Sequence, residues 1–555
     1  MYIFTLFSLT VLSAVLFALG IPNELLYFGS HVLGLISLIP LYYAFVLSKN
    51  RKCSAICFGL WVALVHVLSS FWLGFFRDFA IFTLGVSSVA YFLLTLCFGP
   101  LFYEVVRLRN KRMRPLFFAV VWVFWEWFKS NGFLAYPWGT IPMTAFRSEW
   151  VKQIADITGV WGISFVIALF SSSLAIILPS IFHVVENTIQ VKKINFASIL
   201  FGVKTKAETS IFAFCLVVFC FCAGYSMYHL NQPLVPVDNL KVAIVQANSN
   251  SWEVEFNEQL AHSINLTESL LNHSEKPDLI LWHEGILHYT FPLSLPYYFL
   301  YPEKYTFSEF LKKNNIPLLA GTALPMNMDT QNSSNDLHFF ANSVCLISPD
   351  CEILDWYSKI HLVPFAEYMP LIEKEWVRNI FSSLVGFSSA YIPGNEYKLI
   401  TLTKQNGKTI HFSTPICFED AFSSLCAHLH NLGSELIINL TDDSWSHTKS
   451  AEYQHFVVAS YRSIELRTTL IRSTNSGYSC IVNPKGIVTD DLPLFTEAGL
   501  YADVPIYPYQ ITFYARFKDW LPSMCYLIII GFIIIKPLKV KKTYFLETTD
   551  KKESH

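Results

Sequence analysis

Three side chains in the second half of the chain, Glu284, Lys359 and Cys417, could together support nucleophilic catalysis at a carbonyl carbon. Cys417 follows an apolar run in "TIHFSTPICF", and the pKa of a thiol is lowered at the start of a helix. A carboxylate such as Glu284 can take the thiol proton, and an ammonium such as Lys359 can stabilise an oxyanion. Each residue alone also has an ordinary explanation, as a core thiol, a surface charge or a strand end. The hypothesis therefore depends on the elements that would bring the three together.

The segment "PDLILWHEGILH", residues 277–288, has a second possible role. Its histidines and Glu284 could bind a metal instead of serving nucleophilic catalysis. On a helix, however, His283 and His288 would project about 140° apart. The zinc-protease motif needs histidines four residues apart rather than five. The short apolar run before Glu284 is instead typical of a buried strand, and Glu284 then stands at its carboxyl end, where α/β sheets tend to bind ligands. We therefore predict a strand-end carboxylate and no metal.

The region from about residue 240 onward alternates short apolar runs with helical patterns, separated by Pro, Gly, Asn and Asp. Runs such as "KVAIVQAN", "ELIINL" and "TTLIRS" predict strands, and residues 256–273 and 451–467 carry apolar side chains at helical spacing. "SPDCEI" and "NPKGIV" are typical of hairpin turns. This pattern predicts an α/β domain with a mixed sheet, in which Lys359 follows a hairpin-like segment and Cys417 follows a strand.

The first 230 residues are strongly apolar, and they account for much of the 53% hydrophobic and 15% charged content of the chain. A helix of about 20 apolar residues crosses a bilayer. We predict about eight such spans, at roughly 1–21, 31–48, 54–76, 79–104, 115–130, 159–184, 209–229 and 519–536. The first lacks a positive amino-terminal region and an obvious cleavage site, so we interpret it as a retained span rather than a signal peptide.

Basic clusters give the expected orientation of these spans. "KNRK", "RLRNKRMR", "VKK" with "VKTK", and "KPLKVKK" each follow an even-numbered span. The side that they mark is cytoplasmic by the positive-inside rule, so residues 230–518 are expected on the opposite face. The net charge of −2 gives no indication of nucleic-acid binding.

Two features of the membrane part could carry chemistry. Glu126, within "WVFWEWF", is an acid inside a span and therefore a candidate functional residue. The loop "NGFLAYPWGTIP" is aromatic and rich in Gly and Pro, so we expect it at the membrane interface. The twelve cysteines form no C-x-x-C pair and have no zinc-ribbon spacing.

The order of Glu284 after one strand, Lys359 after a hairpin and Cys417 after a later strand resembles the Glu-Lys-Cys triad of the nitrilase superfamily. The flanking segments "HLVPFAEYMP", "ICFED" and "QHFVVASYRSIELRTTLIRSTNSG" are similar to those of the apolipoprotein N-acyltransferase family, as are "FLAYPWGT" and "GVWGISF". The resemblance covers most of the chain. It implies a polytopic α-helical membrane domain of about eight spans that carries an outer α/β domain, a nitrilase-like α-β-β-α sandwich.

The resemblance also implies a chemistry. Cys417 would attack a phospholipid ester as the nucleophile and form a thioester. The α-amine of S-diacylglyceryl-cysteine at the N-terminus of an apolipoprotein would then take the acyl chain. Glu284 would be the proton acceptor, and Lys359 would stabilise the oxyanion. The family's motifs further imply Glu367, Glu419 and Phe418 as supporting residues and Trp252 and Trp445 as substrate-binding residues. No cofactor and no metal are implied.

The same resemblance implies how the chain is placed. We expect a transmembrane domain of seven spans at 1–231, the catalytic domain at 232–516, an eighth span at 517–540 and a cytoplasmic tail at 541–555. The protein is expected to be a monomer in a bacterial inner membrane, with the catalytic domain on the periplasmic side. Tethering at both ends would hold the site at the membrane surface, which lowers the entropy cost of meeting two lipid substrates.

The sequence departs from the family pattern at four places. His283 stands where a Pro usually precedes the Glu, Ala366 replaces a Gly, Phe418 replaces a Tyr, and "TDDSW" replaces a Ser-Asn-Asp start. The change at Phe418 removes a hydroxyl beside the nucleophile.

Two alternative functions stay open. One is a membrane-tethered nitrilase-type amidase or hydrolase that uses water as the acceptor, although a soluble amide substrate gains nothing from the spans. The other is a transporter, or a scaffold with an outer sensor domain. The scarcity of charged residues inside the spans and the absence of an evident repeat in the sequence argue against it.

Overall fold

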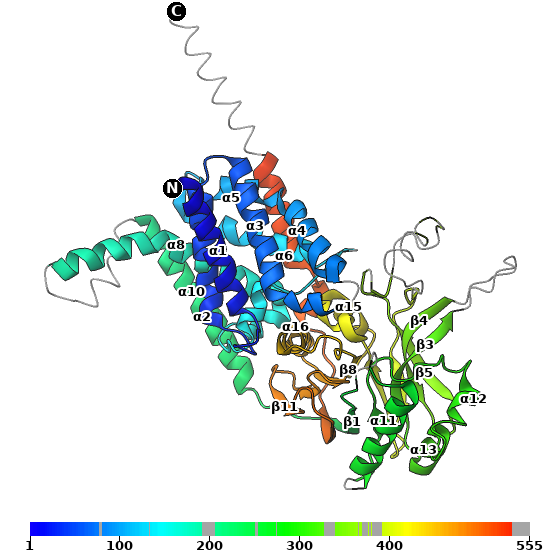
Figure 1. Cartoon of the computed structure of the whole chain (residues 1–555). Coiled ribbons are helices and arrows are strands. Elements are labelled where there is room, and N and C mark those ends of the chain that lie inside the picture. Colours follow the sequence, from blue (N-terminus) through cyan, green and yellow to red (C-terminus); the bar gives the residue numbers. More distant parts are fainter. Residues whose placement is uncertain are drawn as a thin grey trace, which may run out of the picture.

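A computed structural model describes residues 1–76, 80–132, 134–190, 206–249, 253–272, 275–326, 339–364, 366–368, 374, 376, 379 and 391–534. A bundle of apolar helices lies beside an α/β part (Figure 1). The chain begins in the bundle, forms the α/β part, and returns to the bundle through the helix Trp520–Ile534, drawn in red.

The helices of the bundle follow the apolar runs of the sequence. They are α1 (Tyr2–Gly20), α2 (His31–Leu47), α3 (Arg51–Ser69), α4 (Ser87–Thr95), α5 (Phe98–Val105), α6 (Arg114–Lys129), α8 (Val160–Gln190), α10 (Lys206–Asn231) and Trp520–Ile534. Side chains cap two of them, because Ser30 accepts from the backbone N–H of Leu33 and Asn50 accepts from that of Cys53. Large aromatic side chains such as Phe58 and Trp122 fill the centre of the bundle.

Each of the eight predicted spans coincides with a helix or a broken helix, but these helices differ in length. Among the described residues, α1, α3, α10 and the Val160–Leu178 part of α8 are long and apolar enough to cross a membrane. The pair Thr83–Thr95 and Phe98–Val105, bent by 45°, adds a fifth if it is one span. The helices α2 and Trp520–Ile534 are apolar but shorter. Several helices can therefore span a membrane, whereas the number of eight stays a prediction.

Two six-stranded sheets with similar strand arrangements form the α/β part in the described residues. The first contains the parallel strands β1 (Asp238–Gln246), β2 (Leu279–Leu281) and β3 (Leu318–Met326), with β12 (Ala498–Ile506), β4 (Phe339–Ile347) and β5 (Ile353–Ser358) antiparallel to their neighbours. The second contains the parallel strands β7 (Thr409–Ser413), β8 (Leu436–Thr441) and β9 (Thr469–Thr474), with β6 (Ile400–Thr403), β10 (Cys480–Val482) and β11 (Val488–Asp491) antiparallel.

The two sheets pack face to face, with helices on their outer faces. Helices α11 (Phe256–Leu271) and α13 (Phe307–Asn314) cover the first sheet, and α15 (Ser423–His430) and α16 (Lys449–Leu466) cover the second. Every residue of β8 and β9 is buried, as expected for central parallel strands covered on both sides. This is the α-β-β-α sandwich that the resemblance implied. The strands β6 and β12 were not predicted from the sequence.

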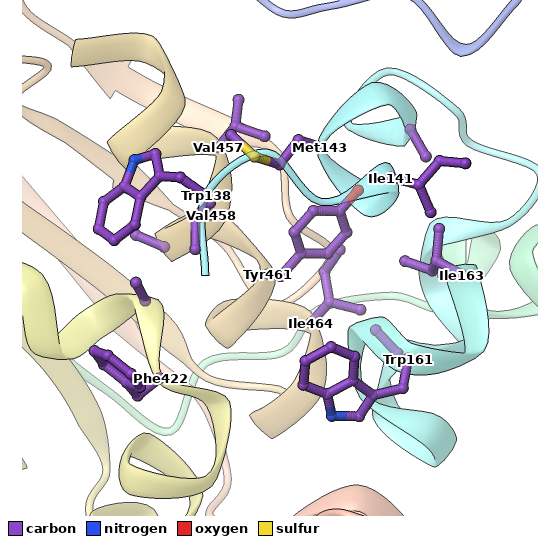
Figure 2. Close-up of a cluster of buried hydrophobic side chains, with 14 of the residues drawn as sticks. Trp138, Ile141, Met143, Trp161, Ile163, Phe422, Val457, Val458, Tyr461 and Ile464 are labelled. Carbon is purple, nitrogen blue, oxygen red and sulfur yellow. The ribbon is translucent and has the colours of Figure 1, made fainter. Parts of the chain in front are cut away.

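The α/β part contacts the helical bundle along α16. Figure 2 shows α16 residues packed against the loop after α6 and the start of α8, through Trp138, Ile141, Met143, Trp161, Ile163, Val457, Val458, Tyr461 and Ile464. Polar contacts cross the same boundary, because the Tyr461 hydroxyl donates to the Pro142 carbonyl at 2.8 Å and Arg467 pairs with Asp156 at 2.7 Å. Trp138 of this loop is buried against the α/β part, and the position of the loop at the membrane interface stays a prediction.

Candidate active site

Strand ends from both sheets bring the three predicted residues to one place. Glu284 follows β2 of the first sheet, Lys359 follows β5 directly, and Cys417 follows β7 of the second sheet. Gly321 of β3 allows the Glu284 turn to pack closely, because a Cβ atom there would lie 2.6 Å from the Cα of Glu284. The face-to-face packing of the sheets then brings the two turns close enough for the Glu284 carboxylate to act on the Cys417 thiol.

Lys359 is buried between two carboxylates. Its ammonium lies 3.3 Å from Oε1 of Glu284 and 2.9 Å from Oε1 of Glu367. The side-chain amide of Asn342 donates to the same two oxygens, at 2.7 and 2.8 Å. Burial alone would lower the pKa of Lys359, but the charges of Glu284 and Glu367 raise it well above its usual value. The lysine therefore stays an ammonium and supplies a fixed positive charge.

The thiol of Cys417 lies within the field of this cluster. Burial and the Glu284 carboxylate raise its pKa well above the usual value, and the Lys359 ammonium opposes that effect. The expected lowering by a helix start was wrong, because Cys417 opens only a five-residue 3-10 turn, η7 (Cys417–Ala421), and desolvation dominates its pKa. The thiol is thus protonated at neutral pH, and it could act as a nucleophile only after a base removes its proton.

Glu419 joins the turn that carries Lys359 to the turn that carries Cys417. Its carboxylate accepts from the backbone N–H groups of Ile360 at 2.7 Å, His361 at 2.9 Å and Ile416 at 2.9 Å. The Tyr357 hydroxyl donates to it at 3.1 Å. Burial raises the pKa of Glu419 to about 7. The predicted supporting residue thus acts by joining segments that are far apart in the sequence.

Glu367 stabilises the loop that follows Lys359 by a hydrogen bond within that loop. Its second oxygen accepts from the backbone N–H of Val363 at 2.8 Å. The first oxygen faces Lys359 and Asn342, so the carboxylate is held from both sides. Asn342 was missed by the sequence analysis, since an asparagine inside a strand carries no local sign of its partners.

The aromatic ring of Phe418 packs against the membrane part. It stacks on Trp138 with centroids 5.4 Å apart, and it meets Phe422 edge-on at 4.8 Å. The position beside the nucleophile is thus filled by an apolar ring that joins the two parts of the molecule.

The other predicted residues have different surroundings. Trp445 follows β8 and contacts Trp72 and Phe76 of the membrane part, with ring centroids 5.7 and 5.0 Å apart. Trp252 lies outside the described residues. His283 is buried, and its Nδ1 pairs with the carbonyl of Glu284 at 2.8 Å. Within the described residues, no three His, Cys, Asp or Glu side chains gather as a metal site would require.

Glu126, the acid inside a predicted span, holds the loop that carries Trp138. Its carboxylate accepts from the backbone N–H of Ile141 at 2.7 Å and from the Ser164 hydroxyl at 2.6 Å. Lys129, one turn further along α6, donates to the carbonyls of Trp138 at 2.7 Å and Gly139 at 2.9 Å. Both charged side chains therefore satisfy loop backbone groups in a buried setting.

Comparison with known proteins matches both parts of the chain. A family model for the apolipoprotein N-acyltransferase N-terminal domain matches residues 13–173, and one for carbon-nitrogen hydrolase matches residues 241–509. The protein named apolipoprotein N-acyltransferase 2 of Treponema denticola is 43% identical over 98% of this chain and 100% of its own length. The chain belongs to the apolipoprotein N-acyltransferase family.

Two further members of this family are similar over nearly the whole chain. Apolipoprotein N-acyltransferase 2 of Treponema pallidum is 41% identical over 93% of this chain and 92% of its own. Apolipoprotein N-acyltransferase of Borreliella burgdorferi is 31% identical over 95% of this chain and 94% of its own. The family models cover both the helical bundle and the α/β sandwich, and membership in this family of acyltransferases argues against the alternatives of a transporter or of a scaffold with an outer sensor domain.

Proposed function

We propose that the protein transfers an acyl chain from a membrane phospholipid to the N-terminal α-amine of S-diacylglyceryl-cysteine in apolipoproteins. One observation carries this proposal: the Lys359 ammonium lies between the carboxylates of Glu284 and Glu367, and the charges of Glu284 and Lys359 both act on the Cys417 thiol. Such a group can activate a thiol and stabilise the tetrahedral oxyanion of acyl transfer. Family membership supports the same activity.

The first half-reaction would load the enzyme. Glu284 takes the proton of the Cys417 thiol as the sulfur attacks the ester carbonyl of the phospholipid. The Lys359 ammonium stabilises the oxyanion that forms. When the intermediate collapses, the carbon–oxygen ester bond breaks and Glu284 returns the proton to the alkoxide. The products are a lysophospholipid and a thioester on Cys417.

The second half-reaction would unload it. The α-amine of the diacylglyceryl-cysteine attacks the thioester carbonyl, and Glu284 accepts a proton from the amine. The carbon–sulfur bond then breaks, the sulfur regains its proton, and the acyl chain remains in a new amide bond. The thioester keeps the acyl group activated between the two steps, so the reaction needs no cofactor.

The membrane part gives this chemistry its location. We place residues 1–231 in seven spans, 232–516 in the catalytic domain, 517–540 in the eighth span and 541–555 on the cytoplasmic side of a bacterial inner membrane. The catalytic domain would face the periplasm, and the protein would act as a monomer. Trp445, which contacts Trp72 and Phe76 at the boundary with the bundle, is proposed to contact lipid substrate, and Trp252 is proposed for the same role.

The test uses purified protein in detergent with a phospholipid that carries a radiolabelled acyl chain. We expect the label to become bound to the protein and to be released by hydroxylamine, which cleaves thioesters. Addition of a diacylglyceryl-cysteine peptide should move the label to the peptide amine. Release of the label as free fatty acid with no transfer to the peptide would instead support the alternative, a membrane-tethered hydrolase.

Cys417→Ala tests the role of the nucleophile. Cys426→Ala is its matched control, because Cys426 is a buried thiol of the neighbouring helix α15. Cys417→Ala should lose the label, and Cys426→Ala should keep it. Transfer to the peptide by the Cys417→Ala protein would show that the thioester mechanism is wrong.

A further inference from the structure

Beneath the nucleophile turn lies a buried group of charged side chains that the two half-reactions do not use. Its centre is His455 of α16. Around it stand Asp420 from η7, Asp443 from the turn after β8, and Arg472 from β9. All four side chains are buried. None of them was predicted from the sequence to take part in the reaction.

Both ring nitrogens of His455 face acceptor atoms. Nδ1 lies 3.0 Å from each oxygen of Asp443. Nε2 lies 3.0 Å from Oδ1 of Asp420 and 3.3 Å from the carbonyl oxygen of Cys417. A neutral imidazole can donate from only one nitrogen, so this arrangement is satisfied by the doubly protonated ring. Burial alone would lower the pKa of His455, but Asp443 and Asp420 raise it to about 9.

The charges of the cluster balance when His455 is protonated. Asp420 pairs with His455 and with Arg472, and Arg472 also lies 3.8 Å from Asp443. Glu452, the other acid nearby on α16, has a pKa raised well above its usual value by burial and by Asp443, which favours its neutral form. Two carboxylates therefore face two cations. Without the proton of His455, one negative charge would remain beside the thiol, and Asp443 already raises the pKa of Cys417.

The same imidazole holds the backbone of the nucleophile. Cys417 has a φ of +48°, a left-handed conformation that costs energy for a residue with a side chain. Its carbonyl oxygen accepts from His455 and, at 3.2 Å, from the side-chain amide of Asn439. That amide also donates to the Pro415 carbonyl at 2.8 Å. Two buried donors thus hold the backbone conformation of Cys417, whose thiol lies within the influence of the Glu284 and Lys359 charges.

We propose that His455 is a positioning residue for acyl transfer, which as an imidazolium holds the carbonyl of Cys417 and neutralises the Asp420–Asp443 pair beneath the thiol. This inference rests on the proposed role of Cys417 as the nucleophile. The groups that face the His455 ring are Asp420, Asp443 and Arg472, together with the uncharged indole of Trp138, whose centroid lies 5.6 Å away. The ring therefore acts on the thiol through charge and backbone geometry, without contact with either lipid.

The test measures the reactivity of Cys417 in the full chain in detergent. Wild-type and variant proteins are treated with iodoacetamide between about pH 6 and pH 10, and alkylation of the peptide that contains Cys417 is followed by mass spectrometry. His455→Gln leaves a net negative charge, so we expect its alkylation profile to move to higher pH by about one unit. Asp443→Asn leaves a net positive charge, so its profile should move to lower pH by a similar amount.

Charge rescue separates this role from a merely structural one. The double variant His455→Gln/Asp443→Asn is neutral again, so its profile should return toward that of wild type, although the lost bond to the Cys417 carbonyl is not restored. In the acyl-transfer assay, His455→Gln should lower kcat roughly tenfold, because a pKa one unit higher leaves one-tenth of the thiolate at a given pH. The KM for phospholipid should stay unchanged, since His455 does not contact substrate.

The outcomes are distinct. The inference is overturned if the folded His455→Gln and Asp443→Asn proteins both keep the wild-type profile, or if the double variant is shifted as far as His455→Gln. If His455→Gln does not fold, the Asp443→Asn profile decides alone. Failure of the proposed function would be seen in the acyl-transfer assay, as acyl transfer by the Cys417→Ala protein. That result would leave the alkylation profiles unaffected.

Discussion

The indole of Trp138 lies flat on the phenyl ring of Phe418, with ring centroids 5.4 Å apart and ring planes inclined by 8°. Trp138 belongs to the membrane part, and Phe418 follows Cys417, the proposed nucleophile. The loop of Trp138 is in turn held by Lys129 and Glu126 of α6. The turn that carries Cys417 therefore rests on a chain of contacts that begins inside the helical bundle.

Loss of the Trp138 ring is expected to impair formation of the acyl-enzyme. Trp138→Ala leaves a cavity against Phe418, with a cost of about 3–5 kcal/mol for a buried aromatic side chain. Trp138→Phe keeps a flat ring and should retain most of the activity. Unfolding temperature and single-turnover acylation of Cys417 measure the two effects. An Ala variant that acylates at the wild-type rate would show that the contact does not serve the nucleophile.

A methyl group at Gly321 should displace Glu284. A Cβ at this position would lie 2.6 Å from the Cα of Glu284, and that neighbour is backbone, which cannot rotate away. Because an error of about 1 Å in a catalytic group can cost 100-fold, we expect Gly321→Ala to lose 10- to 100-fold in acylation. Gly224→Ala is the matched control, since its Cβ would meet open space. Equal activity of the two variants would contradict the prediction.

The positions of Glu284, Lys359 and Cys417, the proposed triad, could be predicted from the sequence because each follows a recognisable apolar strand or hairpin segment. Glu284 after "LILW" and Cys417 after "TIHFS" illustrate this, since the ends of strands in one sandwich meet. Their partners could not be predicted the same way. Asn342 reaches Glu284 across 58 residues and Trp138 stacks on Phe418 across 280. Nothing local in a single sequence marks such pairs.

Two other differences between the prediction from sequence and the structure have physical reasons. The prediction of a lowered Cys417 pKa used a local rule for helix starts, whereas burial of the site dominates. The strand β12 was missed because most of its residues are half-buried, without the clean alternation that marks a strand. It is the pairing of β12 with β1 that defines it, and that pairing joins segments about 260 residues apart in the sequence.

Replacement of Glu419 by Gln should loosen the turns that position Lys359 and Cys417. The carboxylate accepts from three backbone N–H groups and one hydroxyl, and an amide would present its own donors to one of them. Hydrogen bonds to charged groups are worth about 1.5–3 kcal/mol, so we expect a loss of that order in stability together with slower acylation.

Glu268→Gln provides the comparison for this effect. Glu268 also accepts several hydrogen bonds, from Tyr305, Lys313 and Asn314, but it lies on α11 on the outer face of the first sheet. The Glu268→Gln variant should lose stability without a change in the acylation rate of the folded protein. An equal loss of acylation in both variants would mean that Glu419 acts only through general stability.

The proton on His455 predicts how stability depends on pH. Its pKa is raised from 6.5 to about 9 in the folded protein, so the folded state binds this proton more tightly than the unfolded state. The resulting stabilisation, roughly 3 kcal/mol for a shift of this size, is fully present below pH 6.5 and is lost as the pH rises through about 9. His455→Gln removes it at every pH. The gap in unfolding temperature between wild type and His455→Gln should therefore be widest near pH 6 and shrink toward pH 9.5. Glu419 does not contact His455 and titrates in both proteins, so its contribution cancels in this difference. A gap that stays constant over the whole range would mean that the imidazole is neutral in the folded protein.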